Sequence, residues 1–170
     1  MKIFYLLLST LLLSSCSTVP KTITPVTGFE LDKYLGTWYE IARLDHRFER
    51  GLEQVSANYS INDDGTVRVE NRGYSSAKKE WKDAIGKAKF AKDKQTGHLK
   101  VSFFGPFYGS YIIFDLDKEH YQYSFITGSK NTLWLLARTP QVSDDIKQTF
   151  IKKVTDAGYN ANELIFVKQK

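Results

Sequence analysis

The sequence predicts an all-β fold: an eight-stranded antiparallel up-and-down barrel, with one C-terminal α-helix packed outside it and a short final strand. Aromatic residues make up 14% of the 170 residues, with ten Tyr and eleven Phe, and such side chains favour strands. Short runs of alternating apolar and polar residues fill residues 36–138, and only after them does the apolar period change from two to 3.6. Eight consecutive antiparallel strands lose both exposed edges when they close into a barrel, so we expect the first strand to pair with the eighth.

The first strand is expected to begin after Gly36, which allows a sharp turn without a Cβ clash. Strict alternation places Arg43 on one face of this strand. The other face carries Trp38, Glu40, Ala42 and Leu44. The later strands are expected at residues 55–61, 66–72, 81–90, 99–103, 110–116, 120–127 and 131–138. The turn at residues 62–65 ends in a glycine that can adopt a positive φ, so the strands on either side of it form a hairpin.

A single amphipathic helix follows the eighth strand. Ser143 is the expected N-cap, and Gly158 the residue that ends the helix. Ile146, Phe150 and Val154 share one face, which needs an apolar surface to cover. Residues 133–137 are apolar on both faces of their strand, as expected for a strand buried between the barrel interior and an outer helix, and residues 163–167 form the final strand.

The N-terminus has the pattern of an export signal. Lys2 precedes an apolar run at residues 3–13 that is too short to span a bilayer, which needs about 20 residues. Residues 13–16, Leu-Ser-Ser-Cys, resemble the lipobox of bacterial lipoproteins, in which the cysteine becomes the acylated N-terminus. We therefore expect residues 1–15 to be a lipoprotein signal peptide and Cys16, the only cysteine, to be the lipid attachment site. An ordinary signal peptide with a coincidental cysteine is the alternative.

The residue after the cysteine bears on the location. Ser17 stands where an Asp would resemble an inner-membrane retention signal, so the predicted location is the bacterial outer membrane, lipid-anchored on the periplasmic face. Residues 16–28 contain two prolines and no periodicity, which predicts a lipidated tether before a folded domain at residues 29–170. The net charge of +5, one unit of which belongs to Lys2, is too small and too dispersed to predict a nucleic-acid partner.

The barrel interior is the predicted working part, because a barrel of eight strands can hold one small ligand. Alternation directs a mostly apolar set of side chains inward, in which Tyr108 and Trp134 stand nearest to an opening. The set is Ala57, Tyr59, Val67, Val69, Ala88, Phe90, Val101, Phe103, Tyr108 and Trp134. Such a lining favours an aliphatic chain, which gains about 0.8 kcal/mol per buried CH₂. Plain core packing is the alternative for each residue.

Catalytic chemistry is hard to assemble from this sequence. It has one cysteine, no Gly-rich phosphate loop and three His without metal-ligand spacing, so we predict no catalytic residue, no metal and no cofactor. Glu40 is expected to form a structural salt bridge, and residues 45–50 a polar loop at the barrel mouth. Two alternatives stay open: an enzyme on the same scaffold that uses Glu40 or His46, and a structural envelope lipoprotein whose lumen is filled.

Three stretches in order, Gly36-Thr37-Trp38, residues 116–121 and residues 133–138, resemble the signature regions of the lipocalins. The resemblance covers about residues 29–168, and residues 39–51 and 101–109 are similar to bacterial outer-membrane lipocalins. It implies fatty acids or lysophospholipids as ligands, a role in the cell envelope and a possible homodimer. It also implies that Gly36, Trp38 and Arg138 form the fold signature, with Arg138 packed on Trp38 as a cation–π pair at one end of the barrel. Residues 116–121 depart from the fuller second motif, which weakens assignment of that turn to receptor recognition.

Overall fold

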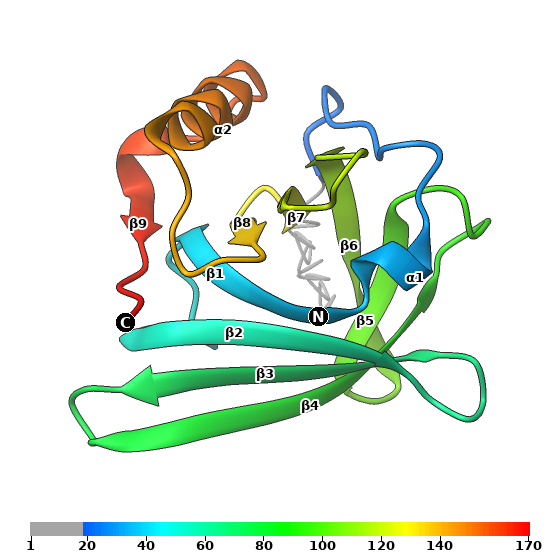
Figure 1. The fold of residues 1–170 in the computed structure, drawn as a ribbon, viewed down its shortest axis with the longest axis horizontal. Helices are drawn as coiled ribbons and strands as arrows, with labels where there is room; N and C mark the ends of the chain where they lie inside the picture. The colour runs from blue at the N-terminus through cyan, green and yellow to red at the C-terminus, as the bar shows by residue number, and fades with distance from the viewer. Residues whose placement is uncertain (1–18) are drawn as a thin grey trace, which may run out of the picture.

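The computed structural model describes residues 19–170 and confirms the predicted barrel (Figure 1). The predicted signal peptide and Cys16 lie outside the described residues. The barrel strands are β1 (Gly36–Leu44), β2 (Leu52–Ile61), β3 (Val67–Ser75), β4 (Glu80–Phe90), β5 (His98–Phe104), β6 (Phe107–Leu116), β7 (Tyr123–Ser129) and β8 (Thr132–Ala137). Each strand pairs antiparallel with the next, and β1 pairs with both β2 and β8, so the sheet closes as predicted.

A bulge in β1 changes which of its side chains face inward. The register with β8 shifts between Glu40 and Ala42, so Ile41 and Ala42 both pack in the outer cluster beneath the helix. Arg43 turns to the side of Glu40, to whose carboxylate it donates a hydrogen bond. The prediction that strict alternation holds along this strand is therefore wrong beyond Glu40, because one extra residue reverses the alternation.

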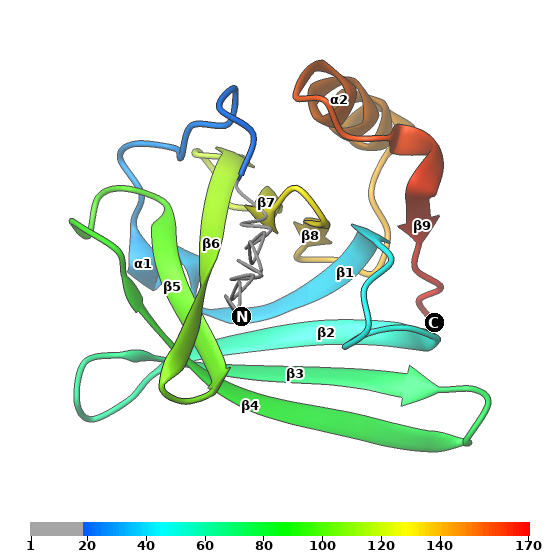
Figure 2. The ribbon, with the colours of Figure 1, turned by 180° about the vertical axis from the view of Figure 1, so that it is seen from behind.

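The β3–β4 hairpin projects beyond the rest of the barrel wall (Figure 2). Residues Lys87–Phe90 of β4 pair with β5, whereas residues Glu80–Gly86 pair only with β3. Ala84 lies four positions before the predicted inward residue Ala88, so alternation puts it on the same face, yet it is exposed to solvent. The N-terminal half of β4 therefore has no hydrogen-bonded neighbour on the β5 side.

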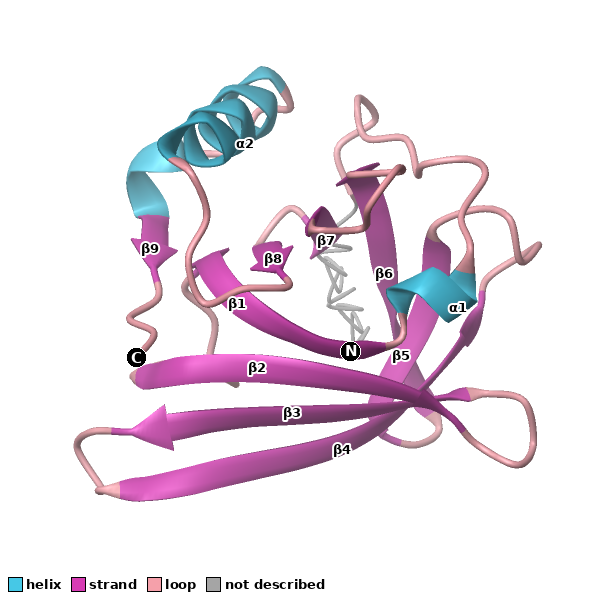
Figure 3. Cartoon of the chain, viewed as in Figure 1, coloured by secondary structure: helices cyan, strands magenta, loops and turns pink. Residues whose placement is uncertain are grey.

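The predicted helix packs on the outside of the barrel, as α2 (Asp144–Asp156), and is the main helix in Figure 3. Ser143 Oγ caps it by accepting a hydrogen bond from the Ile146 N–H at 3.4 Å. Phe150 and Val154 are fully buried, and the Phe150 ring meets the Phe125 ring edge-on at 4.9 Å. The chain then forms a 3₁₀ turn, η1 (Ala161–Glu163), and a final strand, β9 (Leu164–Phe166), which pairs with β1 outside the barrel.

A short helix that the sequence did not predict, α1 (Leu31–Tyr34), covers one end of the barrel. Behind it lies Trp38, fully buried, with the Arg138 guanidinium 4.0 Å from its ring centroid, as the cation–π prediction requires. Gly36 has a φ of +90°, which explains why a glycine stands there. Part of the expected tether also lies against this end: the Val26 N–H donates to the Ile113 carbonyl, and the Gly97 N–H donates to Val26.

Within residues 19–170, neither α-helix combines the length and the apolar character that spanning a bilayer requires.

Candidate functional site

The barrel contains a cavity that is partly open to solvent. The space between its lining atoms is about 760 Å³ when the open solvent is counted, and the centre of a water-sized sphere fits in about 90 Å³ of it. Eight of the predicted inward residues line it: Ala57, Tyr59, Val67, Val69, Ala88, Val101, Phe103 and Trp134. These side chains come from β2, β3, β4, β5 and β8, where alternation places them on the concave face. Other apolar side chains complete the wall, namely Leu31, Val55, Leu99, Ile126 and Leu136.

Two predicted lining residues lie elsewhere. Tyr108 lies on the outer face, 38% exposed, with the Lys89 ammonium 4.5 Å from its ring centroid. It is three positions from Tyr111, which points into the cavity, and an odd spacing puts the two rings on opposite faces of β6. Phe90 packs in the interior core but not along the cavity, since it meets Phe29 at the helix-covered end, with ring centroids 6.2 Å apart.

Three tyrosines form the floor of the cavity, next to α1. The Tyr111 hydroxyl lies 2.8 Å from that of Tyr34 and 2.9 Å from that of Tyr59, and Ser124 Oγ is 3.3 Å from Tyr34. Burial raises the pKa of Tyr34 to about 12 and the pKa values of Tyr59 and Tyr111 well above their ordinary value. The floor is therefore an uncharged hydrogen-bonded cluster at neutral pH.

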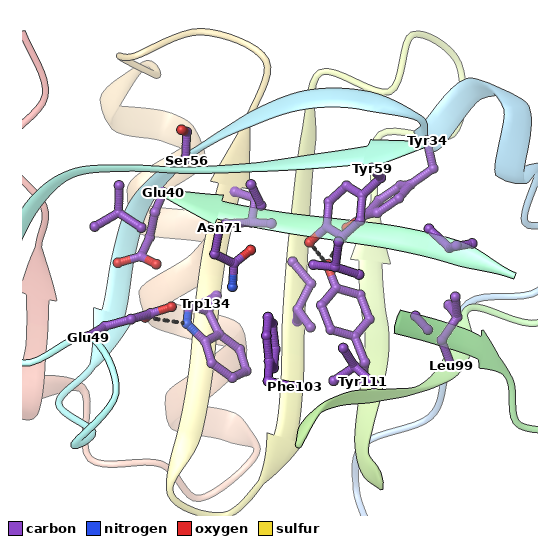
Figure 4. A pocket seen from close by; sticks show the side chains of 18 of the residues that line it. Tyr34, Glu40, Glu49, Ser56, Tyr59, Asn71, Leu99, Phe103, Tyr111 and Trp134 are labelled. Carbon is purple, nitrogen blue, oxygen red and sulfur yellow. Dashed lines mark hydrogen bonds between the residues drawn. The ribbon is translucent and has the colours of Figure 1, made fainter. Parts of the chain in front are cut away.

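A polar group lies at the other end, the mouth of the cavity, beside the loop between β1 and β2 (Figure 4). Glu49 turns inward from this loop, and its Oε2 accepts a hydrogen bond from Trp134 Nε1 at 3.1 Å. His46 Nε2 lies 2.9 Å from the same oxygen, and the imidazole meets the indole edge-on at 5.3 Å. Burial alone would raise the pKa of Glu49, but the contacts of His46 and Trp134 outweigh burial and lower it.

Glu40 and Arg43 form a buried ion pair beside this group. Arg43 Nη1 donates to Glu40 Oε1 at 2.6 Å, and Nη2 donates to the carbonyls of Glu49 and Leu52, so Arg43 also holds the loop in place. Burial and the nearby Glu49 carboxylate raise the pKa of Glu40. The salt bridge expected for Glu40 is present, and the Arg43 contacts give it a structural role.

One further polar atom faces the cavity without a protein partner. Asn71, on β3, lies among the lining residues, and its Oδ1 is buried and accepts no hydrogen bond within the part of the chain that the structure describes. A buried acceptor without a donor is costly, so a ligand that supplies a hydroxyl would offset that cost. Figure 4 shows this amide between the two polar ends of the cavity.

Over residues 19–170, no three His, Cys, Asp or Glu side chains come together as a metal site. The alternation of strands identified much of the apolar wall, and it also places Asn71 on the inward face, two positions after Val69. The prediction of an apolar lining left Asn71 out because it is polar, whereas Glu49 enters from a loop, where alternation assigns no direction to a side chain.

Comparisons with known proteins agree with this geometry. The model of the Lipocalin-like domain matches residues 29–169. Relatives named Outer membrane lipoprotein Blc are 52% identical in Vibrio cholerae, over all of both chains, and 47% identical in Escherichia coli K12, over 93% of this chain and 90% of the relative. Insecticyanin from the tobacco hornworm Manduca sexta has the same fold, with a TM-score of 0.70 at 19% identity, over 87% of this chain and 85% of that structure. The chain belongs to the lipocalin family.

Proposed function

We propose that this lipocalin is a membrane-anchored lipid-binding protein that binds, stores or transports fatty acids or lysophospholipids in the cell envelope. The observation that carries the proposal is the cavity itself: its wall is apolar over most of its length, with a neutral tyrosine floor and a polar group at the loop end. A single acyl chain matches the wall, and each buried CH₂ contributes about 0.8 kcal/mol. The unpartnered Asn71 acceptor supports a ligand that can donate a hydrogen bond inside the cavity.

The proposed location is the outer membrane, with the anchor at acylated Cys16 on the periplasmic face. Two observations support it: the lipobox-like residues before Cys16, and the relatives whose name is Outer membrane lipoprotein. More than one acyl chain is needed for durable anchoring, and lipoprotein modification of a cysteine supplies them. The anchor would keep the cavity close to a source of lipid.

The proposal is tested by filling the cavity. Ala88 is buried in the wall, so Ala88→Phe places a ring where an acyl chain would lie. We expect a fluorescent fatty-acid analogue to bind the full chain, to be displaced by lysophospholipid, and to bind A88F at least about tenfold more weakly, which corresponds to about 1.4 kcal/mol.

A matched control is available on the same strand. Ala84 is exposed and outside the cavity, so A84F makes the same chemical change without filling the site. It should bind the analogue like the wild type. Equal binding by A88F, with its fold intact by circular dichroism, would show that the ligand lies elsewhere.

A further inference from the structure

Three exposed phenylalanines surround the loop end of the cavity, and we call them the mouth rim: Phe48, Phe104 and Phe107. Their exposed fractions are 63%, 70% and 79%, whereas aromatic side chains on a soluble surface are usually covered. The rings of Phe48 and Phe104 lie 6.5 Å apart, and Phe104 is opposite Phe107 across the β5–β6 turn. Two loops far apart in sequence thus contribute to one apolar patch, which marks an interaction surface.

The rim borders the cavity directly. Phe48 precedes Glu49, which lines the cavity, and Phe104 follows Phe103, which also lines it. In both loops one side chain points in and its neighbour points out. Whatever covers the rim therefore also lies at the entrance of the cavity.

Cations accompany the rim aromatics. The Arg47 guanidinium lies 4.7 Å from the Phe48 ring centroid, and Lys89 lies over Tyr108, the residue next to Phe107. Neither cation has an acidic partner within 4.0 Å over residues 19–170. The nearby acids are occupied, since Asp45 is paired with Arg50 and Glu49 faces the cavity. The charge beside the rim is thus positive.

We propose that the mouth rim docks on a bilayer that contains anionic phospholipid, as a second membrane contact separate from the Cys16 anchor. Phenyl rings at the boundary of headgroups and acyl chains, with cations beside them, match the chemistry of an interfacial contact. Each Lys or Arg near an anionic surface adds to the attraction between the protein and the bilayer. Docking in this way opens the cavity onto the membrane, so a single-chain lipid enters without crossing water.

Site-directed spin labelling of the full chain, reconstituted into phosphatidylethanolamine vesicles with and without phosphatidylglycerol, tests the proposal. Phe107→Cys carries one label, and Phe166→Cys, at an exposed aromatic of β9, carries the matched control. The unsubstituted chain should take no label, because its one cysteine is the predicted acylation site. When phosphatidylglycerol is present, we expect the collision rate between the label at position 107 and a water-soluble nickel chelate to fall several-fold. The collision rate of the label at position 166 should change little.

Two results would overturn docking. Equal accessibility of the two labels to the chelate would show that the rim stays in water. Spin–spin broadening between labels at position 107 would show that a second copy of the chain covers the rim instead. The experiment does not depend on ligand binding: a chain that binds no fatty acid still reports whether its rim enters the bilayer.

Discussion

At the scale of single residues, the sequence predicted the polar loop at the cavity mouth, residues 45–50, but not which of its side chains point into the cavity. His46 and Glu49 lie in a loop, where neither a period of two nor one of 3.6 assigns a direction to a side chain. The period did assign Ala57, Val69 and Ala88 to the interior correctly, because they lie on regular strands. It failed where the phase of a strand was not fixed, as for Tyr108.

Glu49 gives a prediction about pH. Its pKa is lower in the folded chain than in the unfolded one, so its carboxylate stabilises the fold fully above the ordinary glutamate pKa. That contribution is lost as the pH falls through the folded pKa. We therefore expect the free energy of unfolding to fall more steeply below about pH 4.5 in the wild type than in Glu49→Gln, measured by urea denaturation at a series of pH values.

The control for this experiment is Glu119→Gln, since the Glu119 side chain is 85% exposed. It should reproduce the wild-type pH dependence. Identical pH profiles for the wild type and E49Q would contradict the view that His46 and Trp134 stabilise the ionised carboxylate.

At the scale of elements, the two ends of β1 show what periodicity can and cannot predict. The Gly36–Trp38 turn and the pairing with β8 were predictable, because the turn chemistry and the closure of the barrel are encoded locally. The bulge after Glu40 was not, because it depends on how β1 bends to pair with β2, β8 and β9 in turn. The α2 helix was predictable almost to the residue, since its cap and apolar face lie within the segment itself.

Arg138, at the end of β8, joins three elements, and its loss tests that junction. Besides the contact with Trp38, Nη1 donates to the Thr37 carbonyl at 2.9 Å, and Nη2 donates to the Lys33 carbonyl at 2.7 Å. We expect Arg138→Met to destabilise the fold by about 2–4 kcal/mol, from the lost cation–π contact and charged hydrogen bonds together. Chemical denaturation measures this difference.

Arg72 provides the comparison, because its guanidinium lies 4.7 Å from the ring centroid of the half-exposed Trp81. Arg72→Met should cost less than about 1 kcal/mol, as exposed pairs do. Similar losses for R138M and R72M would mean that the closed end of the barrel does not depend on the arginine.

At the scale of the whole molecule, the barrel separates two surfaces with different roles. The outer face of β1, β7 and β8 is covered by α2, whose Phe150 and Val154 complete a second apolar cluster. The inner face keeps a space that its own side chains leave unfilled, from the tyrosine floor to Glu49. Barrel closure could be predicted from the number of strands, but the size of that space depends on side chains brought together across the barrel, such as Tyr59 and Tyr111.

The most direct test of the binding role is mass spectrometry of lipid that co-purifies with the full chain and with A88F from the same cells. We predict that the wild type retains a non-covalently bound single-chain lipid, a fatty acid or lysophospholipid, at near-equal stoichiometry, and that A88F loses most of it. The absence of such a lipid from the wild type, or its equal retention by folded A88F, would contradict the proposal that the barrel cavity is a lipid-binding site.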